Sequence, residues 1–124
     1  MNNDEYVKAL RAIFERALSI HQMARREGLL AVEGSIDTEK VNKRDIYEYG
    51  LSFVIDGIDT EFIDKILSNI IDREKDDTVK TLKTIQKEAV LSIQRGDNTR
   101  ILLAIMNSYT DLPLNDAIMK NYLD

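Results

Sequence analysis

The apolar residues of this chain recur at intervals of three and four almost throughout, and this period constrains the fold more than any other feature. Near the start of the chain one such stripe, which also contains the only histidine, comprises Leu10, Ile13, Phe14, Ala17, His21, Ala24, Gly28 and Ala31. Hydrophobic residues at this spacing line one face of an α-helix, which must pack against a core. We therefore predict a long first helix over about Asp4 to Glu33, with Gly34 as its stop.

Two short glycine-containing segments mark helix boundaries further along the chain. Gly57-Ile58-Asp59 combines a glycine that tolerates a left-handed helix end with an aspartate that can cap the next helix. Gly96-Asp97-Asn98 repeats that chemistry. These signals predict a second helix over about Asp45 to Asp56 and a later one over about Thr99 to Tyr109. Residues 35–44 are mostly polar and have no period, so we expect a connecting loop there.

The stretch from Thr60 to Arg95 contains no glycine or proline, and its apolar residues keep the helical period. A single helix of this length would be about 54 Å long. The charged segment Asp72 to Asp77 has no apolar residue to anchor it to a core, which favours two helices that break there. One continuous helix with an exposed turn is the alternative. Pro113, the only proline, is expected to open a last short helix that carries Ala117, Ile118 and Tyr122.

These patterns together predict an all-α protein, a compact bundle of about five or six helices with a long first helix. At 124 residues the chain is long enough to bury one hydrophobic core without staples. No internal repeat, low-complexity tract or linker divides the sequence. We therefore expect residues 1–124 to form a single helical domain.

The charge balance bears on the partners that the chain can have. Its formal net charge of -5 argues against nucleic acid or an anionic membrane as the main partner, because both attract concentrated positive charge. The one basic cluster is Arg25-Arg26, with Lys40, Lys43 and Arg44 in the following loop. It lacks the glycine-rich loop or interleaved aromatic residues of phosphate and base sites. The absence of cysteine excludes disulfides and thiolate-metal sites and is compatible with a cytoplasmic location.

No part of the sequence has the length and apolar character of a membrane span. The longest apolar run, Ile101 to Met106, is far shorter than the roughly 20 residues that a spanning helix requires. The amino-terminal residues 1–5 are polar and acidic, unlike the start of a secretory signal. We therefore expect no transmembrane segment, while peripheral association with a membrane remains open.

The sequence offers little for catalysis. His21 lies on the apolar stripe, and Arg25 stands at the i+4 position where a partner carboxylate would be expected. A structural role is therefore favoured over that of a catalytic base or metal ligand. The aspartates follow no calcium-loop pattern, and no nucleophile elbow, phosphate loop or paired-carboxylate motif is present. We expect no catalytic, cofactor or metal site and no enzymatic activity, with an enzyme based on His21 as the weakest alternative.

Three segments of the chain, taken in order, are similar to one known family. They are Ala24-Arg25-Arg26-Glu27-Gly28-Leu29-Leu30-Ala31-Val32-Glu33, Tyr49 to Asp59, and Lys87 to Leu102. Together they resemble the cytoplasmic part of MotA-type flagellar stator subunits, over about Ala17 to Asn107. In that family a pair of transmembrane helices separates the second segment from the third; here a polar stretch stands in that place, and the initial transmembrane pair is missing too. Thr99 also replaces the family's usual proline.

The resemblance implies a role in the flagellar motor. MotA-type subunits contact the rotor switch protein FliG through an arginine and a glutamate that flank the glycine of the first segment, and these correspond to Arg25 and Glu33. We expect Arg26 to belong to the same partner-binding surface. On one helix, Arg25 and Glu33 would lie about 12 Å apart along the axis and about 80° apart around it. The implied function is protein–protein contact with FliG or with stator subunits, in the cytoplasm at the flagellar base, without ion conduction.

Two features beside these charges leave a second interpretation open. Leu29-Leu30-Ala31-Val32 would cover every side of a helix for one turn, and enclosure by the following helices is favoured over contact with another chain. Gly28 would cost about 1 kcal/mol inside a helix, which indicates close approach of a neighbouring backbone. The alternative function is a structural or regulatory module that forms homo-oligomers through an apolar seam, without a direct rotor contact.

Overall fold

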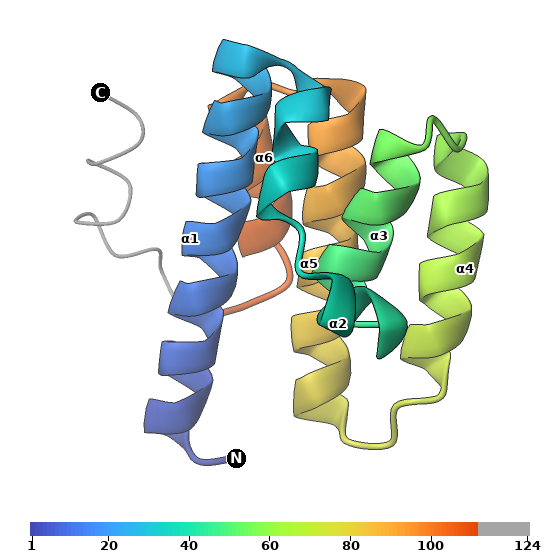
Figure 1. Ribbon diagram of the computed structural model, residues 1–124. Helices are drawn as coiled ribbons and strands as arrows, with labels where there is room; N and C mark the ends of the chain where they lie inside the picture. Colours follow the sequence, from blue (N-terminus) through green and yellow to red (C-terminus); the bar gives the residue numbers. More distant parts are fainter. Residues whose placement is uncertain (112–124) are drawn as a thin grey trace.

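The chain folds as an all-helical bundle in which the first helix is the longest (Figure 1). The computed structural model describes residues 1–111, and within them there are six α-helices, one 3₁₀-helix and no β-strand. The predicted fold class is therefore confirmed. The elements are α1 (Asn3–Glu27), η1 (Leu29–Ser35), α2 (Thr38–Asn42), α3 (Ile46–Ile55), α4 (Thr60–Asp72), α5 (Asp77–Arg95) and α6 (Thr99–Asn107).

Polar side chains placed just before the helices fix where most of them begin. Each accepts a hydrogen bond from a backbone N–H of the first turn, which has no partner inside the helix. The capping side chains are Asn2 for α1, Asp37 for α2, Asp45 for α3, Asp76 for α5 and Asn98 for α6. Asp59 precedes α4 without making such a bond.

Helix α5 is the centre of the bundle, because it packs against α1, α3, α4 and α6 (Figure 1). Its side chains Ile85, Ala89 and Val90 are fully buried. Packing is tight at Gly50 of α3, where a Cβ would lie 3.0 Å from Leu67 Cδ1 and 3.1 Å from Val90 Cγ1. A glycine is needed there because three helices meet at one point.

The first helix ends earlier than predicted. Gly28 has φ 89° and ψ 161°, and its N–H closes the last turn of α1 by donating to the Ala24 carbonyl at 2.9 Å. A Cβ at Gly28 would meet nothing within 4 Å, so the expectation of a close backbone neighbour is wrong. The helix can end at this point because residue 28 is a glycine, and its non-helical backbone conformation is accessible almost only to glycine. Gly34 lies within η1 and is not the stop.

Other boundaries were predicted with more success. The chain does break between Asp72 and Asp77, so α4 and α5 are two helices. Gly57 and Gly96 both have left-handed φ values, as their helix-end positions require. The polar segment 35–44 is not all loop, because α2 forms within it. The short helix expected after Pro113 lies outside the described residues.

Of the helices formed by residues 1–111, none combines the length and the apolar character needed to cross a bilayer.

Candidate docking surface

The junction between α1 and η1 forms one end of the bundle (Figure 1). The turn at Gly28 directs the chain out of α1 and back along the bundle as a 3₁₀-helix. Val32 is fully buried, but Leu30 is 73% exposed and Leu29 is 37% exposed. The expected enclosure of this apolar turn is therefore correct for Val32 and wrong for the two leucines.

The charged residues predicted to bind a partner surround these leucines in the sequence. Arg25 and Arg26 lie in the last turn of α1, Glu33 lies in η1, and all three are exposed. None of the three side chains forms an ion pair or hydrogen bond with another residue of the described part of the chain. Arg25 and Arg26 also complement the negative end of the α1 dipole, which accounts for part of their placement.

The predicted geometry of Arg25 and Glu33 needs a correction. They do not share a helix, because Gly28 separates α1 from η1. The axial and angular spacing expected for one continuous helix therefore does not apply. What remains of the prediction is that both side chains are exposed, on the two elements that meet at Gly28.

A partly buried ion pair links α1 to α3 beside η1. Arg16 Nη2 of α1 donates to Glu48 Oε1 of α3 at 2.9 Å and to the Ser35 carbonyl at the end of η1 at 3.1 Å. Glu48 is only 6% exposed, and the Ser35 hydroxyl donates to the Val32 carbonyl at 2.7 Å. Arg16 thus connects α1 both to α3 and to the last residue of η1, and its charge compensates the nearly buried Glu48 carboxylate.

His21 connects α1 to the turn between α5 and α6. It is 2% exposed, and its Nε2 lies 2.7 Å from the carbonyl oxygen of Asp97 in the α5–α6 turn. The Asp97 carboxylate is bound elsewhere, by the Ser92 hydroxyl at 2.7 Å and by Arg95 Nη2 at 2.9 Å. Burial raises the pKa of Asp97, but the hydrogen bonds from Ser92 and Arg95 outweigh it, so the pKa lies below its ordinary value. His21 is thus positioned to join α1 to the α5–α6 turn.

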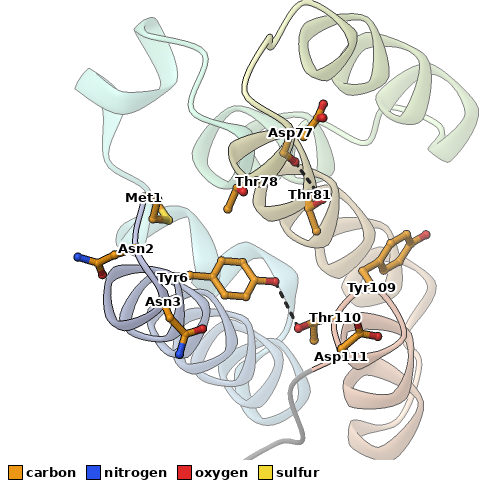
Figure 2. Close-up of a pocket in the computed structure, with 10 residues that line it drawn as sticks. All are labelled: Met1, Asn2, Asn3, Tyr6, Asp77, Thr78, Thr81, Tyr109, Thr110 and Asp111. Carbon is orange, nitrogen blue, oxygen red and sulfur yellow. Dashed lines mark hydrogen bonds between the residues drawn. The ribbon is translucent and has the colours of Figure 1, made fainter.

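Figure 2 shows an open cleft of about 510 Å³. It lies where the first turns of α1 and α5 meet the end of α6, and the Tyr6 hydroxyl donates across it to Thr110 Oγ1 at 3.3 Å. Among residues 1–111, its lining includes the carboxylates Asp77 and Asp111 but no lysine, arginine or histidine. The charge pattern predicted from the sequence lies instead at the α1–η1 junction.

Within residues 1–111, no three side chains of the types that hold metal ions gather at one place. Sequence reasoning missed the Arg16–Glu48 brace, because nothing in the sequence pairs two residues on separate helices. It also missed the exposure of Leu29 and Leu30, which depends on how η1 is seated. Comparisons of the chain with protein-family models, with curated proteins and with solved structures give no match.

Proposed function

We propose that this chain acts by protein–protein contact through the α1–η1 junction, as a MotA-like component of the flagellar motor. We call this surface the tip and define it as Arg25, Arg26, Leu29, Leu30 and Glu33. One observation carries the contact proposal. Two exposed leucines stand beside three unpaired charges on a segment that the Arg16–Glu48 pair braces.

The chemistry of the tip suits a partner with an apolar pocket and a mixed-charge rim. Burying an exposed leucine side chain completely contributes about 1.5–3 kcal/mol, which is enough for one side chain to anchor a contact. Arginine and glutamate at the rim mainly set orientation and association rate. A braced backbone loses little conformational entropy on binding, so more of this free energy appears as affinity.

The flagellar part of the proposal rests on the resemblance of three sequence segments to MotA-type subunits. The first of them, residues 24–33, contains every residue of the tip. The third includes Asp97, which contacts His21 behind the tip. The partner proposed on this basis is the rotor switch protein FliG, with stator subunits as the other candidates, in the cytoplasm at the flagellar base.

A paired charge reversal tests this proposal. The variant Arg25→Glu with Glu33→Arg keeps the net charge, and its binding to purified FliG can be measured by calorimetry at two salt concentrations. With about 1 kcal/mol at stake in rim charges, we expect affinity to fall by roughly fivefold at low salt and by less at high salt. Circular dichroism should report an unchanged fold.

The matched control is Lys8→Glu with Glu15→Lys. It reverses two exposed charges of α1 that lie away from the tip and make no ion pair among the described residues. This control should bind FliG like the parent chain. Equal binding by the parent and the tip variant would show that the proposed contact is wrong.

The exposed leucines also favour a second candidate function, a module that assembles with copies of itself. Light scattering over a concentration series separates the two. Assembly that is insensitive to salt and is abolished by Leu30→Glu would favour self-association through the tip. A chain that stays monomeric at high concentration would contradict it.

A further inference from the structure

A second concave surface lies away from the tip, between the α2–α3 turn and the second half of α4. Figure 1 places this turn and the end of α4 at the same end of the molecule, opposite the α1–η1 junction. The cleft has a volume of about 220 Å³, and its lining comprises Arg44, Tyr49, Ile66, Asn69, Ile70 and Arg73. It therefore brings two arginines that are far apart in the sequence to one small cavity.

The two arginines are not neutralised by the described part of the chain. Neither Arg44 nor Arg73 forms an ion pair or a side-chain hydrogen bond there. Two of the three carboxylates beside them in the sequence, those of Asp45 and Glu74, accept hydrogen bonds from other groups. Asp45 caps α3 by accepting from the Glu48 N–H at 3.1 Å.

Glu74 is engaged in the same way. It accepts from Lys83 Nζ at 2.8 Å and from the backbone N–H groups of Lys75 and Asp76. The remaining neighbour is Asp72, the last residue of α4, and its side chain is exposed with no partner in the described residues. The lining of the cleft thus includes two exposed arginines, neither of which forms an ion pair among the described residues, in a chain whose net charge is -5.

Arg44 also adopts a backbone conformation that is unusual for its residue type. Its φ is 60°, and it is the one non-glycine residue with a positive φ among those described. Backbone hydrogen bonds hold the turn, from the Arg44 N–H to the Val41 carbonyl and from the Asp45 N–H to the Lys40 carbonyl, both at 3.0 Å. Glycine or asparagine would adopt this conformation at lower cost. The turn alone therefore does not explain an arginine at this position.

Arg73 has a simpler structural explanation, which must be weighed. It follows the last turn of α4, where a cation complements the negative end of the helix dipole. That dipole also opposes an anion in the cleft, so a ligand needs more than one cation to offset it. Arg44, which comes from a different element, supplies the second.

We propose that this cleft binds a small phosphate monoester. Two guanidinium groups match the charge of such a group, about -1.5 to -2 at neutral pH, and arginine binds phosphate oxygens in a bidentate manner. The Tyr49 hydroxyl and the Asn69 amide can donate further hydrogen bonds. The Tyr49 ring and the two isoleucines offer an apolar wall to the organic part of the ester. The volume of the cleft is below the roughly 300–1,000 Å³ of pockets for drug-sized ligands, so the ligand is small.

Phenyl phosphate is the probe for this proposal, with inorganic phosphate and benzoate as comparisons. Titration into ¹⁵N-labelled full chain, followed by NMR, reports both the affinity and the residues affected. We expect saturable shifts at residues 44, 49, 66, 69, 70 and 73. Phenyl phosphate should bind more tightly than inorganic phosphate, because of the apolar wall. It should bind about tenfold more tightly than benzoate, because of its charge.

Two variants and a control complete the test. Arg44→Asn keeps the preference for a positive φ, so it should fold at least as stably as the parent chain, and we expect it to weaken phenyl phosphate binding by about tenfold or more. Arg73→Gln should weaken binding by a similar factor. Arg100→Gln removes one exposed arginine of α6 and should leave binding unchanged.

Three results would overturn the proposal. They are the absence of shifts at millimolar phenyl phosphate, equal binding of phenyl phosphate and benzoate, and unchanged binding in a folded Arg44→Asn variant. Because the tip lies at the other end of the bundle, Arg44→Asn leaves the FliG experiment unaffected. The two proposals therefore stand or fall separately.

Discussion

Gly28→Ala is the substitution that probes the shape of the tip most sharply. Gly28 has φ 89° and ψ 161°, a region that is essentially reserved for glycine, and holding alanine there costs about 1–3 kcal/mol. The variant could avoid this strained conformation if α1 extended through residue 28. It would then have to expose Val32, which is fully buried, at a cost of about 1.5–3 kcal/mol.

Extension of the helix would also break the hydrogen bond from Arg16 to the Ser35 carbonyl, which adds about 1.5–3 kcal/mol for a charged donor. Extending α1 through residue 28 would therefore cost more free energy than keeping alanine in the strained backbone conformation. We expect Gly28→Ala to keep the fold and to lose about 1–3 kcal/mol in the free energy of unfolding. Urea denaturation followed by circular dichroism measures both quantities.

The matched control is Gly34→Ala in η1. Gly34 has no left-handed φ and open space around its Cβ position, so alanine should be neutral or stabilise the chain by up to about 1 kcal/mol. If the first helix were continuous, Gly28→Ala would instead raise the free energy of unfolding, because alanine is about 1 kcal/mol more favourable than glycine inside a helix. If Gly28→Ala raised both stability and helix content, our account of the junction would be refuted.

Two further predictions concern the core and its polar edge. Gly50→Ala places a Cβ 3.0 Å from Leu67 Cδ1 and 3.1 Å from Val90 Cγ1, and both of these side chains are fully buried. The cost of overpacking, about 1–3 kcal/mol, should exceed the gain in helix propensity, so the urea concentration at the midpoint of unfolding should fall. A higher midpoint would contradict this packing. The hydrogen bond from Lys87 holds the pKa of Asp64 below its ordinary value of 3.8, so Asp64 stabilises the fold above that value and this contribution is lost as the pH falls below it. Stability of Asp64→Asn should therefore decline less steeply with acid than that of the parent chain; identical slopes would contradict the pairing. The difference should be at most about 1 kcal/mol, because the carboxylate is half exposed.

How far the sequence predicts this fold depends on whether a signal is local. The break before α5 was predicted because no apolar residue anchors the charged segment, and in the structure Asp76 caps the helix that begins there. Gly28 was misread because a glycine on an apolar stripe can belong to a helix or end it. In the turned chain Val32 is buried in the core and the Ser35 carbonyl accepts a hydrogen bond from Arg16, and neither interaction can be recognised from the spacing of apolar residues. Helix α2 was missed because it is only five residues long and has no apolar period.

The candidate sites also differ in whether their residues are neighbours in the sequence or are brought together only by the fold. The resemblance to MotA-type subunits assigns Arg25, Arg26 and Glu33 to a partner-binding surface, and all three are exposed in the structure, but their binding role stays a prediction. The sequence grouped Arg44 with Arg25 and Arg26, but in the fold Arg44 lines a cleft with Arg73. Such a pairing joins a turn to a helix end, and no spacing within the sequence encodes it. Only the packing of α3 against α4 brings the two together.

The most direct test of the central claim is a binding footprint. ¹⁵N-labelled chain mixed with unlabelled FliG should show NMR shifts or broadening confined to about residues 24–36, with the strongest effects at Leu29 and Leu30. The α2–α3 turn and α4 should stay unaffected. A footprint centred on any other surface, or no perturbation at concentrations that saturate the binding measured by calorimetry, would contradict the claim that the tip is the docking surface.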